Sequence, residues 1–411
     1  MRSRAQIFTL LWLLYFVQGL PFGFQVTSIP LLLRERGASL FAVTLSGALA
    51  LPWLLKPFLA PLVDSRRSAR WGARRGWILP LQAVLALTLL GVAAVVEPIR
   101  LTPLMVLVIV MNLCAAVMDI AVDGLAIDLL RDGGGLGHGN AAQVVGFKLG
   151  MLTGGGLLLW ASAQVGMALC FVALAAVVLV TLGLVWRFDE PRAEQRAAAE
   201  PPLGGVLRAL KDSLLRPDAG WLILVVLTYK LGESMADRLF KLFVFDAGYD
   251  KADVGLWIDG WGMAFSIGGS LFGGWLATRR TYVSAVMVAA GLRVLPLAAQ
   301  WWLTTQTPSP TAIVTITSAE HFFGGALTTT VFALMMARVD PRIGATHYTA
   351  LAALEVLGKV PGGWLSGLLG DQWGYPPVFA LATVLSVAFL GLLVPLGRAE
   401  RRERAMDSSS G

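Results

Sequence analysis

The sequence has little charge and few cysteines. Only 14% of its 411 residues are Asp, Glu, Lys or Arg, whereas 56% are hydrophobic, and the mean hydropathy is +0.70. A soluble protein of this length needs more charge on its surface, so this class of protein is excluded. The two cysteines, Cys114 and Cys170, lie in apolar runs and offer neither a disulfide framework nor a Cys/His metal spacing. We therefore expect no metal site and no cofactor.

Long apolar runs recur along the whole chain. Each is about 18–25 residues long, the length that an α-helix needs to cross roughly 30 Å of hydrocarbon. The runs do not alternate as barrel strands do, and a helix satisfies its backbone groups within the segment. The sequence predicts an all-α membrane protein whose twelve spans lie at about 7–33, 40–62, 77–97, 103–130, 140–163, 167–187, 220–247, 254–277, 282–303, 311–338, 343–369 and 376–397.

Basic residues are distributed unevenly between the two sets of loops. One set holds 22 Lys and Arg residues, whereas the opposite set holds four, namely Arg34, Arg36, Arg100 and Lys251. The positive-inside rule places the richer set, with both termini, in the cytoplasm. Because the net charge of +7 comes from Arg at helix ends, it does not indicate a nucleic-acid partner.

The longest polar loop, 188–219, divides the chain into six spans and six spans. We expect an N-terminal bundle at 1–187, a cytoplasmic linker at 188–219 and a C-terminal bundle at 220–404, and we leave the tail at 405–411 out of the fold. Lys148 precedes Gly154–Gly156 much as Lys359 precedes Gly362–Gly363, at an offset of 211 residues. Two related six-span halves are typical of a transporter.

Glycine recurs at four-residue spacing in several spans, as at Gly146, Gly150 and Gly154. Small residues at this spacing let two helix backbones approach closely in lipid. We expect these faces to pack, with hinge-like bending as the alternative.

Ionisable residues inside the spans are candidate functional groups, since each costs about 2.5–3.5 kcal/mol at a helix centre. Asp119 and Asp123 are four residues apart and share a helix face, as do Lys230, Glu233 and Asp237. The basic residues at this depth are Lys56, Lys148, Lys230, Arg238, Lys241, Arg293 and Lys359. The candidates for proton coupling are Asp119, Asp123, Lys148, Glu233, Asp237 and Glu320. The alternative is a set of ion pairs that only stabilises one conformation.

Two further groups of side chains have expected roles. The candidates for substrate contact are Tyr15, Gln18, Gln25, Tyr229, Lys230, Trp257, Trp261 and His321. The candidates for a cytoplasmic gate are Asp64, Arg74, Arg75, Asp128 and Glu355. The aromatic residues have an alternative role as interface anchors or packing groups.

Several long motifs are distinctive, namely LLYFVQGLPFGF, LPWLLKPFLAPLVD, MDIAVDGLAIDLL and QVVGFKLGMLTGGGLLLW. They resemble the branch of the Major Facilitator Superfamily that contains muropeptide permeases, acetyl-coenzyme A transporters and bacterial siderophore permeases. The resemblance covers nearly the whole chain. It implies inward-open and outward-open states, a cavity lined by the first, fourth, seventh and tenth spans, and recurrent charged positions at Asp119, Asp123, Lys148, Lys230 and Glu233.

The substrate is inferred from finer features of the resemblance. Phe147–Lys148 stands where muropeptide permeases tend to carry Arg after a Gly-Tyr pair, and the chain lacks the extra C-terminal spans of those permeases. The compact length and the opening YFVQGLP with LLLRERG most resemble permeases for small siderophores such as pyochelin or rhizobactin. We hypothesise a monomeric, proton-driven importer of a free or ferric siderophore in the bacterial inner membrane.

Three alternatives stay open. One is a muropeptide or acetyl-coenzyme A permease of the same branch. The second is a membrane-embedded acyltransferase, although no embedded nucleophile such as a His-x-x-x-x-Asp motif stands out, so we do not expect an enzyme. The third is a sensor or scaffold, for which the short termini offer no signalling domain.

Overall fold

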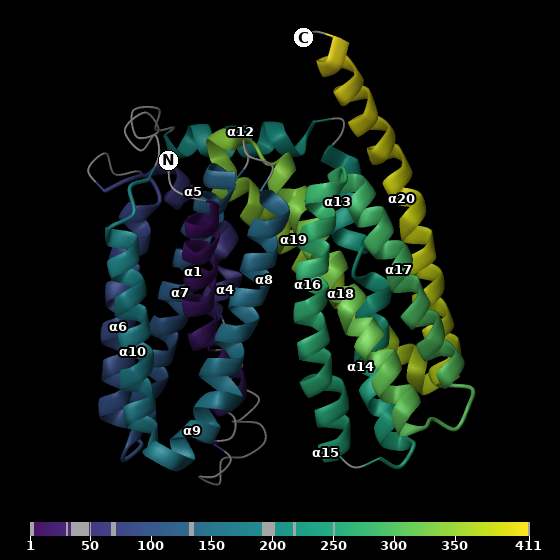
Figure 1. The fold of residues 1–411 in the computed structure, drawn as a ribbon, viewed down its shortest axis with the longest axis horizontal. Coiled ribbons are helices and arrows are strands. Elements are labelled where there is room, and N and C mark those ends of the chain that lie inside the picture. Colours follow the sequence, from purple (N-terminus) through teal and green to yellow (C-terminus); the bar gives the residue numbers. More distant parts are fainter. Residues whose placement is uncertain are drawn as a thin grey trace. The chain divides into compact units, whose positions relative to one another are not determined.

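The computed structural model describes residues 4–29, 32–33, 49, 51–66, 71–130, 135–190, 202–216, 219–249 and 251–409. All regular elements within these ranges are helices (Figure 1). The start of the second expected span, most of 40–50, and the linker residues 191–201 lie outside the described residues. The all-α class predicted from the sequence is confirmed.

The first of two compact units comprises Met1–Gly133, Ala142–Leu210 and Val339–Thr349. Its helices are built from the apolar runs of the N-terminal part of the chain. They are α1 (Arg4–Gly23), η1 (Phe24–Ser28), α4 (Leu51–Leu54), α5 (Lys56–Ser65), α6 (Arg75–Val96), α7 (Leu101–Leu130), most of α8 (Leu136–Leu152), η3 (Thr153–Leu157), α9 (Leu158–Val165), α10 (Met167–Trp186), the start of α12 (Leu203–Leu214) and η5 (Pro341–Ile343).

The second unit comprises Gly134–Ala141, Lys211–Arg338 and Ala350–Gly411. Its apolar core gathers residues of α14, η4, α17, α18 and α20. Its helices are α13 (Ala219–Thr228), α14 (Leu231–Asp246), α15 (Lys251–Val254), η4 (Gly255–Gly260), α16 (Trp261–Arg279), α17 (Tyr282–Leu303), α18 (Pro310–Arg338), most of α19 (Gly344–Trp373) and α20 (Tyr375–Ser409).

Eight stretches of helix in the described residues are long and apolar enough to cross a membrane. The helices α18 and α19 pass the same test together, with a turn of 107° between them, and as one span they would raise the number to nine. These helices are consistent with the twelve expected spans, although only eight or nine of the described helical stretches meet the criteria of length and hydropathy.

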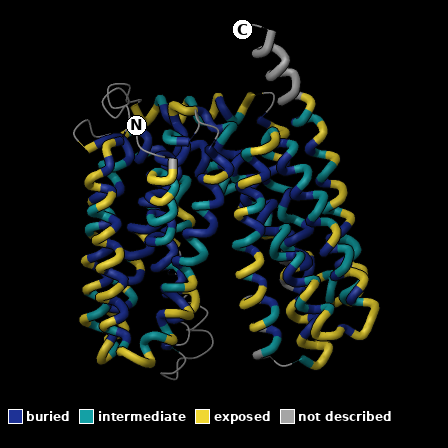
Figure 2. Tube along the Cα trace, in the orientation of Figure 1, coloured by how far each residue is buried: buried dark blue, intermediate teal, exposed yellow. Residues whose placement is uncertain are grey.

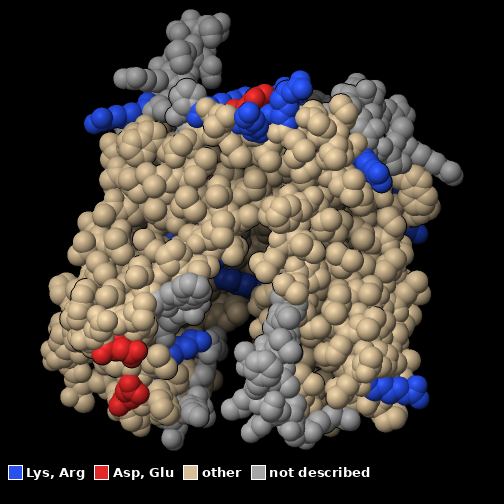
Figure 3. All heavy atoms as spheres, turned by 180° about the vertical axis from the view of Figure 1, so that it is seen from behind, with Lys and Arg blue, Asp and Glu red and all other residues tan. Residues whose placement is uncertain are grey.

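Exposed residues lie mostly along the outer sides of the helices, and buried residues lie mostly inside each bundle (Figure 2). Many of the exposed residues are large and apolar, such as Leu87, Trp160, Val180 and Leu295. On the face drawn in Figure 3, most charged atoms gather near the helix ends and much of the band between them is uncharged. An apolar band of this kind suits contact with lipid.

The glycine spacing reflects close packing of α8 on α1. A Cβ atom added at Gly150 would collide with the carbonyl oxygen of Phe16, and one at Gly146 would lie 2.6 Å from the carbonyl oxygen of Trp12. The prediction that these glycines permit close approach is confirmed.

Two irregularities interrupt the spans near candidate residues. The seventh span breaks at Tyr229–Lys230, between α13 and α14. The first span changes to a π-helix at η1, which contains Gln25. Local π turns inside helices are frequent at functional sites.

Candidate functional site

A buried polar cluster in the first unit is centred on Asp123 of α7. The hydroxyl of Tyr15 on α1 donates a hydrogen bond of 2.9 Å to Asp123 Oδ1. Gln143 on α8 donates from Nε2 to the same oxygen over 3.0 Å, and Tyr348 donates from its hydroxyl to Gln143 Oε1 over 3.2 Å. The candidates Tyr15 and Asp123, which are 108 residues apart, therefore belong to one site.

Asp119 lies one turn before Asp123 and forms an ion pair with Lys56 of α5. The ammonium of Lys56 also lies 5.5 Å from the centre of the Trp53 ring. The fourth expected span thus brings its two carboxylates to the same cluster, as their spacing predicts.

Two glutamines of the first span are also buried. Both side-chain polar atoms of Gln18, and Oε1 of Gln25, have no hydrogen-bond partner within the described part of the chain. Lys148 is half-buried on α8. A buried polar group without a partner costs free energy, so Gln18 is suited to a role other than packing.

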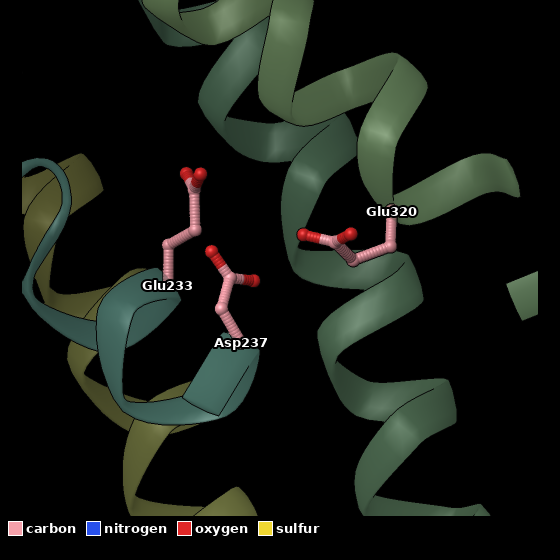
Figure 4. A group of neighbouring side chains, drawn as sticks. All are labelled: Glu233, Asp237 and Glu320. Carbon is pink, nitrogen blue, oxygen red and sulfur yellow. The ribbon is translucent and has the colours of Figure 1, made fainter. Parts of the chain in front are cut away.

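A second buried cluster, in the second unit, is centred on Arg293 of α17. Arg293 pairs with Glu320 of α18, and its Nε lies 3.6 Å from Oε2 of Glu233 on α14. Its Nη2 lies 3.9 Å from Oδ1 of Asp237. Figure 4 shows that Glu233 and Asp237 come from one helix and that the Glu320 carboxylate is directed toward them from another.

Lys230 and His321 extend this cluster through Glu233 and Glu320, respectively. Lys230 Nζ lies 2.5 Å from Glu233 Oε1, and His321 pairs with Glu320 through Nδ1. The side chain of Asp237 is 48% exposed, whereas those of Glu233 and Glu320 are buried. Asp237 is therefore the most exposed carboxylate of this cluster.

Carboxylates outnumber the Lys and Arg side chains that pair with them in the described part of the second cluster. Three carboxylates, Glu233, Asp237 and Glu320, face two permanent cations, Lys230 and Arg293. This excess of acidic side chains makes the cluster a candidate site for proton binding.

The same three carboxylates could in principle hold a cation. One oxygen from each lies within 4.8 Å of the others. Because the Arg293 guanidinium already pairs with all three, it supplies the positive charge that a metal ion would bring. We interpret the group as an ion-pair network.

Glu355 lies in a separate group. It accepts a hydrogen bond of 2.7 Å from the Tyr229 hydroxyl, and its Oε1 lies 2.5 Å from Lys359 Nζ. It thus contacts the helix break at Tyr229, and its ion pair here is with Lys359.

The other expected gate residues are near the start of α6 in the first unit. Arg74 Nη1 lies 2.6 Å from Asp64 Oδ1, and Arg74 Nε lies 3.3 Å from Asp128 Oδ2. The backbone N–H of Thr346 donates to Asp64 Oδ2 over 2.7 Å. Asp64 therefore ties α5 both to Arg74 and to the start of α19.

Electrostatics hold Arg74 in its charged form. Burial opposes the charge on the guanidinium, but the carboxylates of Asp64, Asp128 and Glu190 outweigh burial and raise the pKa of Arg74 above its usual value. Arg75 lies apart from these ion pairs, because its Nη2 donates to the carbonyl oxygen of Trp186 over 2.7 Å.

The expected aromatic residues of the eighth span are not in either cluster. The ring of Trp257 contacts that of Tyr249, with 5.2 Å between centroids, and Trp261 contacts Phe265. Their role in substrate contact stays a prediction.

Sequence reasoning did not identify five groups as partners of the candidate residues. They are Lys56, Gln143, Glu190, Arg293 and Thr346. Lys56 and Arg293 carry a usable signal, since a basic residue inside a span needs a partner. Glu190, whose carboxylate accepts a 3.0 Å hydrogen bond from the Arg74 backbone N–H, lies in a polar loop and carries none.

Comparisons with known proteins agree with this architecture. A family model described as Major Facilitator Superfamily matches residues 11–317. The chain is 26% identical over 387 residues to the anhydromuropeptide permease of Escherichia coli, covering 94% of this chain and 78% of the permease. It is 24% identical over 396 residues to putative transporter AmpG 4 of Rickettsia conorii, with 94% and 95% covered.

Among solved structures, a variant of the Escherichia coli fucose:proton symporter FucP matches with a TM-score of 0.72. The match covers 95% of this chain and 99% of that chain, at 14% sequence identity. At this identity the similarity concerns the fold alone.

Proposed function

Because this chain belongs to the Major Facilitator Superfamily, we propose that it is a proton-coupled transporter that imports a muropeptide-like solute across the bacterial inner membrane. Family membership makes it a transporter and not an enzyme. The solute is inferred from relatives that align over nearly the whole chain and carry the names anhydromuropeptide permease and AmpG.

The siderophore hypothesis receives no support from these relatives. It depends on the compact length and on the opening YFVQGLP with LLLRERG, and Phe147–Lys148 is a departure from the pattern of the muropeptide permeases. The Rickettsia relative, matched over 95% of its own length, has a similarly compact chain and carries an AmpG name. Compactness therefore does not separate a siderophore permease from that group, and we favour the muropeptide alternative.

The excess of carboxylates around Arg293 is the observation that carries the proton-coupling proposal. Of the three acids there, Asp237 is the most exposed, so it is the one that most readily exchanges a proton with water. We assign the transported proton to Asp237. Protonation of Asp237 leaves Glu233 and Glu320 to balance Lys230 and Arg293.

Lys230 offers a link between the proton and the solute. It lies at the helix break and pairs with Glu233. Muropeptides carry peptide carboxylates, and transfer of a proton to Glu233 would release Lys230 to pair with one of them. Proton and solute would then each favour binding of the other, as symport requires.

The Asp64 cluster is the proposed cytoplasmic gate. Its ion pairs and the Thr346 hydrogen bond join α5, the residue before α6, α7 and α19. Arg74 stays charged at any physiological pH, so deprotonation of Arg74 does not open these contacts. We infer that solute binding, and not titration of Arg74, controls the gate.

Ligand-induced thermal stabilisation of the detergent-purified protein tests the substrate. The panel contains an anhydromuropeptide, ferric pyochelin, iron-free pyochelin and acetyl-coenzyme A. A ligand that binds only the folded state adds about 2.7 kcal/mol at a hundred times its Kd. We expect the anhydromuropeptide to raise Tm and the other three compounds to leave it unchanged.

Two variants test whether the anhydromuropeptide binds at Lys230. Lys230→Gln should lose most of the stabilisation by the anhydromuropeptide, and Lys211→Gln, at an exposed position on α12, should keep it. Stabilisation by ferric pyochelin without stabilisation by the anhydromuropeptide would overturn the proposed substrate and favour the siderophore hypothesis.

A further inference from the structure

A hollow of about 460 Å³ lies in the first unit between the start of α1 and the end of α10. Its volume is within the range of about 300–1,000 Å³ that ligand sites occupy. The lining includes Gln6, Thr9, Leu10, Leu13, Leu184 and Arg187. These residues contribute to neither buried ionic cluster, so the proposed transport function does not account for the hollow.

Two tryptophans mark the level of this hollow relative to a membrane. Trp186, which is 56% exposed, precedes Arg187 in sequence and meets Trp71 edge to face, with 5.2 Å between ring centroids. Exposed Trp side chains gather where hydrocarbon meets water. Arg187 therefore lies at the depth of lipid headgroups.

The apolar part of the hollow extends below this level. Leu13 follows Gln6 by seven residues, which is about 10 Å along a helix axis. Leu184 on α10 precedes Arg187 by almost one turn on the side of the membrane interior. The hollow thus has a polar end at the interface and an apolar end in the hydrocarbon.

We propose that this hollow binds an anionic phospholipid of the leaflet that the charge pattern predicts to be cytoplasmic. The phosphate pairs with the guanidinium of Arg187, whose fork of N–H donors matches phosphate oxygens. Gln6 offers a further polar contact at the headgroup. An acyl chain lies along Leu10, Leu13 and Leu184.

The charge around the hollow and its apolar lining favour an anionic phospholipid over other ligands. The loops predicted to be cytoplasmic carry 22 basic residues, and anionic lipids are attracted to basic segments beside a span. An apolar hollow that opens to lipid is filled most readily by a lipid chain, and Arg187 at its rim favours a negative headgroup.

Native mass spectrometry of the full-length protein, titrated with phosphatidylglycerol or phosphatidylcholine, tests the charge selection. One basic residue near a membrane surface contributes about 1 kcal/mol, or roughly fivefold in affinity. Arg187→Ala should weaken phosphatidylglycerol binding by about that factor. The matched control Arg280→Ala, an exposed arginine after the end of α16, should not.

A second pair of variants tests the acyl-chain contact without removing charge. Leu184→Trp fills the hollow and should reduce lipid retention, whereas Leu179→Trp, at an exposed position elsewhere on α10, should not. Equal losses in Arg187→Ala and Arg280→Ala, equal losses in the two Trp variants, or equal binding of phosphatidylcholine would each overturn the proposal.

Discussion

Arg293 is only 1% exposed and faces carboxylates from two other helices. Removal of the guanidinium would leave the buried Glu320 without its arginine partner, whereas Glu233 would keep its ion pair with Lys230. Breaking a buried ion pair in this way costs about 3–5 kcal/mol. We predict that Arg293→Met lowers the free energy of unfolding by an amount in this range, measured by thermal or denaturant unfolding in detergent.

A double variant separates this effect from a simple loss of packing. Adding Glu320→Gln to Arg293→Met removes the carboxylate charge that lost its arginine partner, so it should recover part of the lost stability. If the double variant is as unstable as the sum of the two single variants, the ion-pair account of Arg293 is wrong.

The sequence predicted which acids share a helix face more reliably than it predicted which partners they have. The four-residue spacing of Asp119 and Asp123 places both on one helix face whatever the neighbouring helices do. The pairing of Glu320 with Arg293 depends on how α17 and α18 are rotated against each other, which no spacing within one span reveals. The hydrogen bond from Arg75 to the carbonyl oxygen of Trp186 could not be predicted from the sequence for the same reason.

Substitution of Gly150 tests how closely α8 packs on α1. A Cβ atom there would collide with the Phe16 carbonyl, which belongs to the rigid backbone of α1. Overpacking of this kind costs about 1–3 kcal/mol. We predict that Gly150→Ala destabilises the protein in a thermal unfolding assay.

Gly183→Ala on α10 is the control for the change in residue type. A Cβ atom at Gly183 meets nothing within 4 Å, and alanine has a helix propensity about 1 kcal/mol better than that of glycine. Gly183→Ala should therefore be neutral or stabilising. Equal effects of the two substitutions would contradict the close approach of α1 and α8.

The sequence predicted the positions of many helices because long apolar runs leave little choice of structure in lipid. The ninth expected span, 282–303, coincides with α17 (Tyr282–Leu303). The break at Tyr229–Lys230 was not predicted, since neither residue is a strong helix breaker. Helix α12 within the polar linker was also missed.

At the scale of the whole molecule, each unit holds a buried charged cluster inside its expected spans, around Asp123 in the first and Arg293 in the second. The first unit also holds the buried ion pairs of Arg74. The family could be predicted from motifs that cover most of the chain, and the match over residues 11–317 confirms it. The substrate could not be predicted from the sequence, because only a few residues within a shared fold set solute selectivity. Phe147–Lys148 alone did not identify those residues.

Uptake of a labelled anhydromuropeptide by proteoliposomes, under an imposed proton gradient, tests the central claim most directly. We predict that the wild-type protein and the exposed-site control Asp212→Asn accumulate the solute only with the gradient. Asp237→Asn should exchange solute across the membrane without gradient-driven accumulation, because it cannot carry the proton. Gradient-driven accumulation by Asp237→Asn equal to that of the wild type, or accumulation by the wild type that is indifferent to the gradient, would contradict the account.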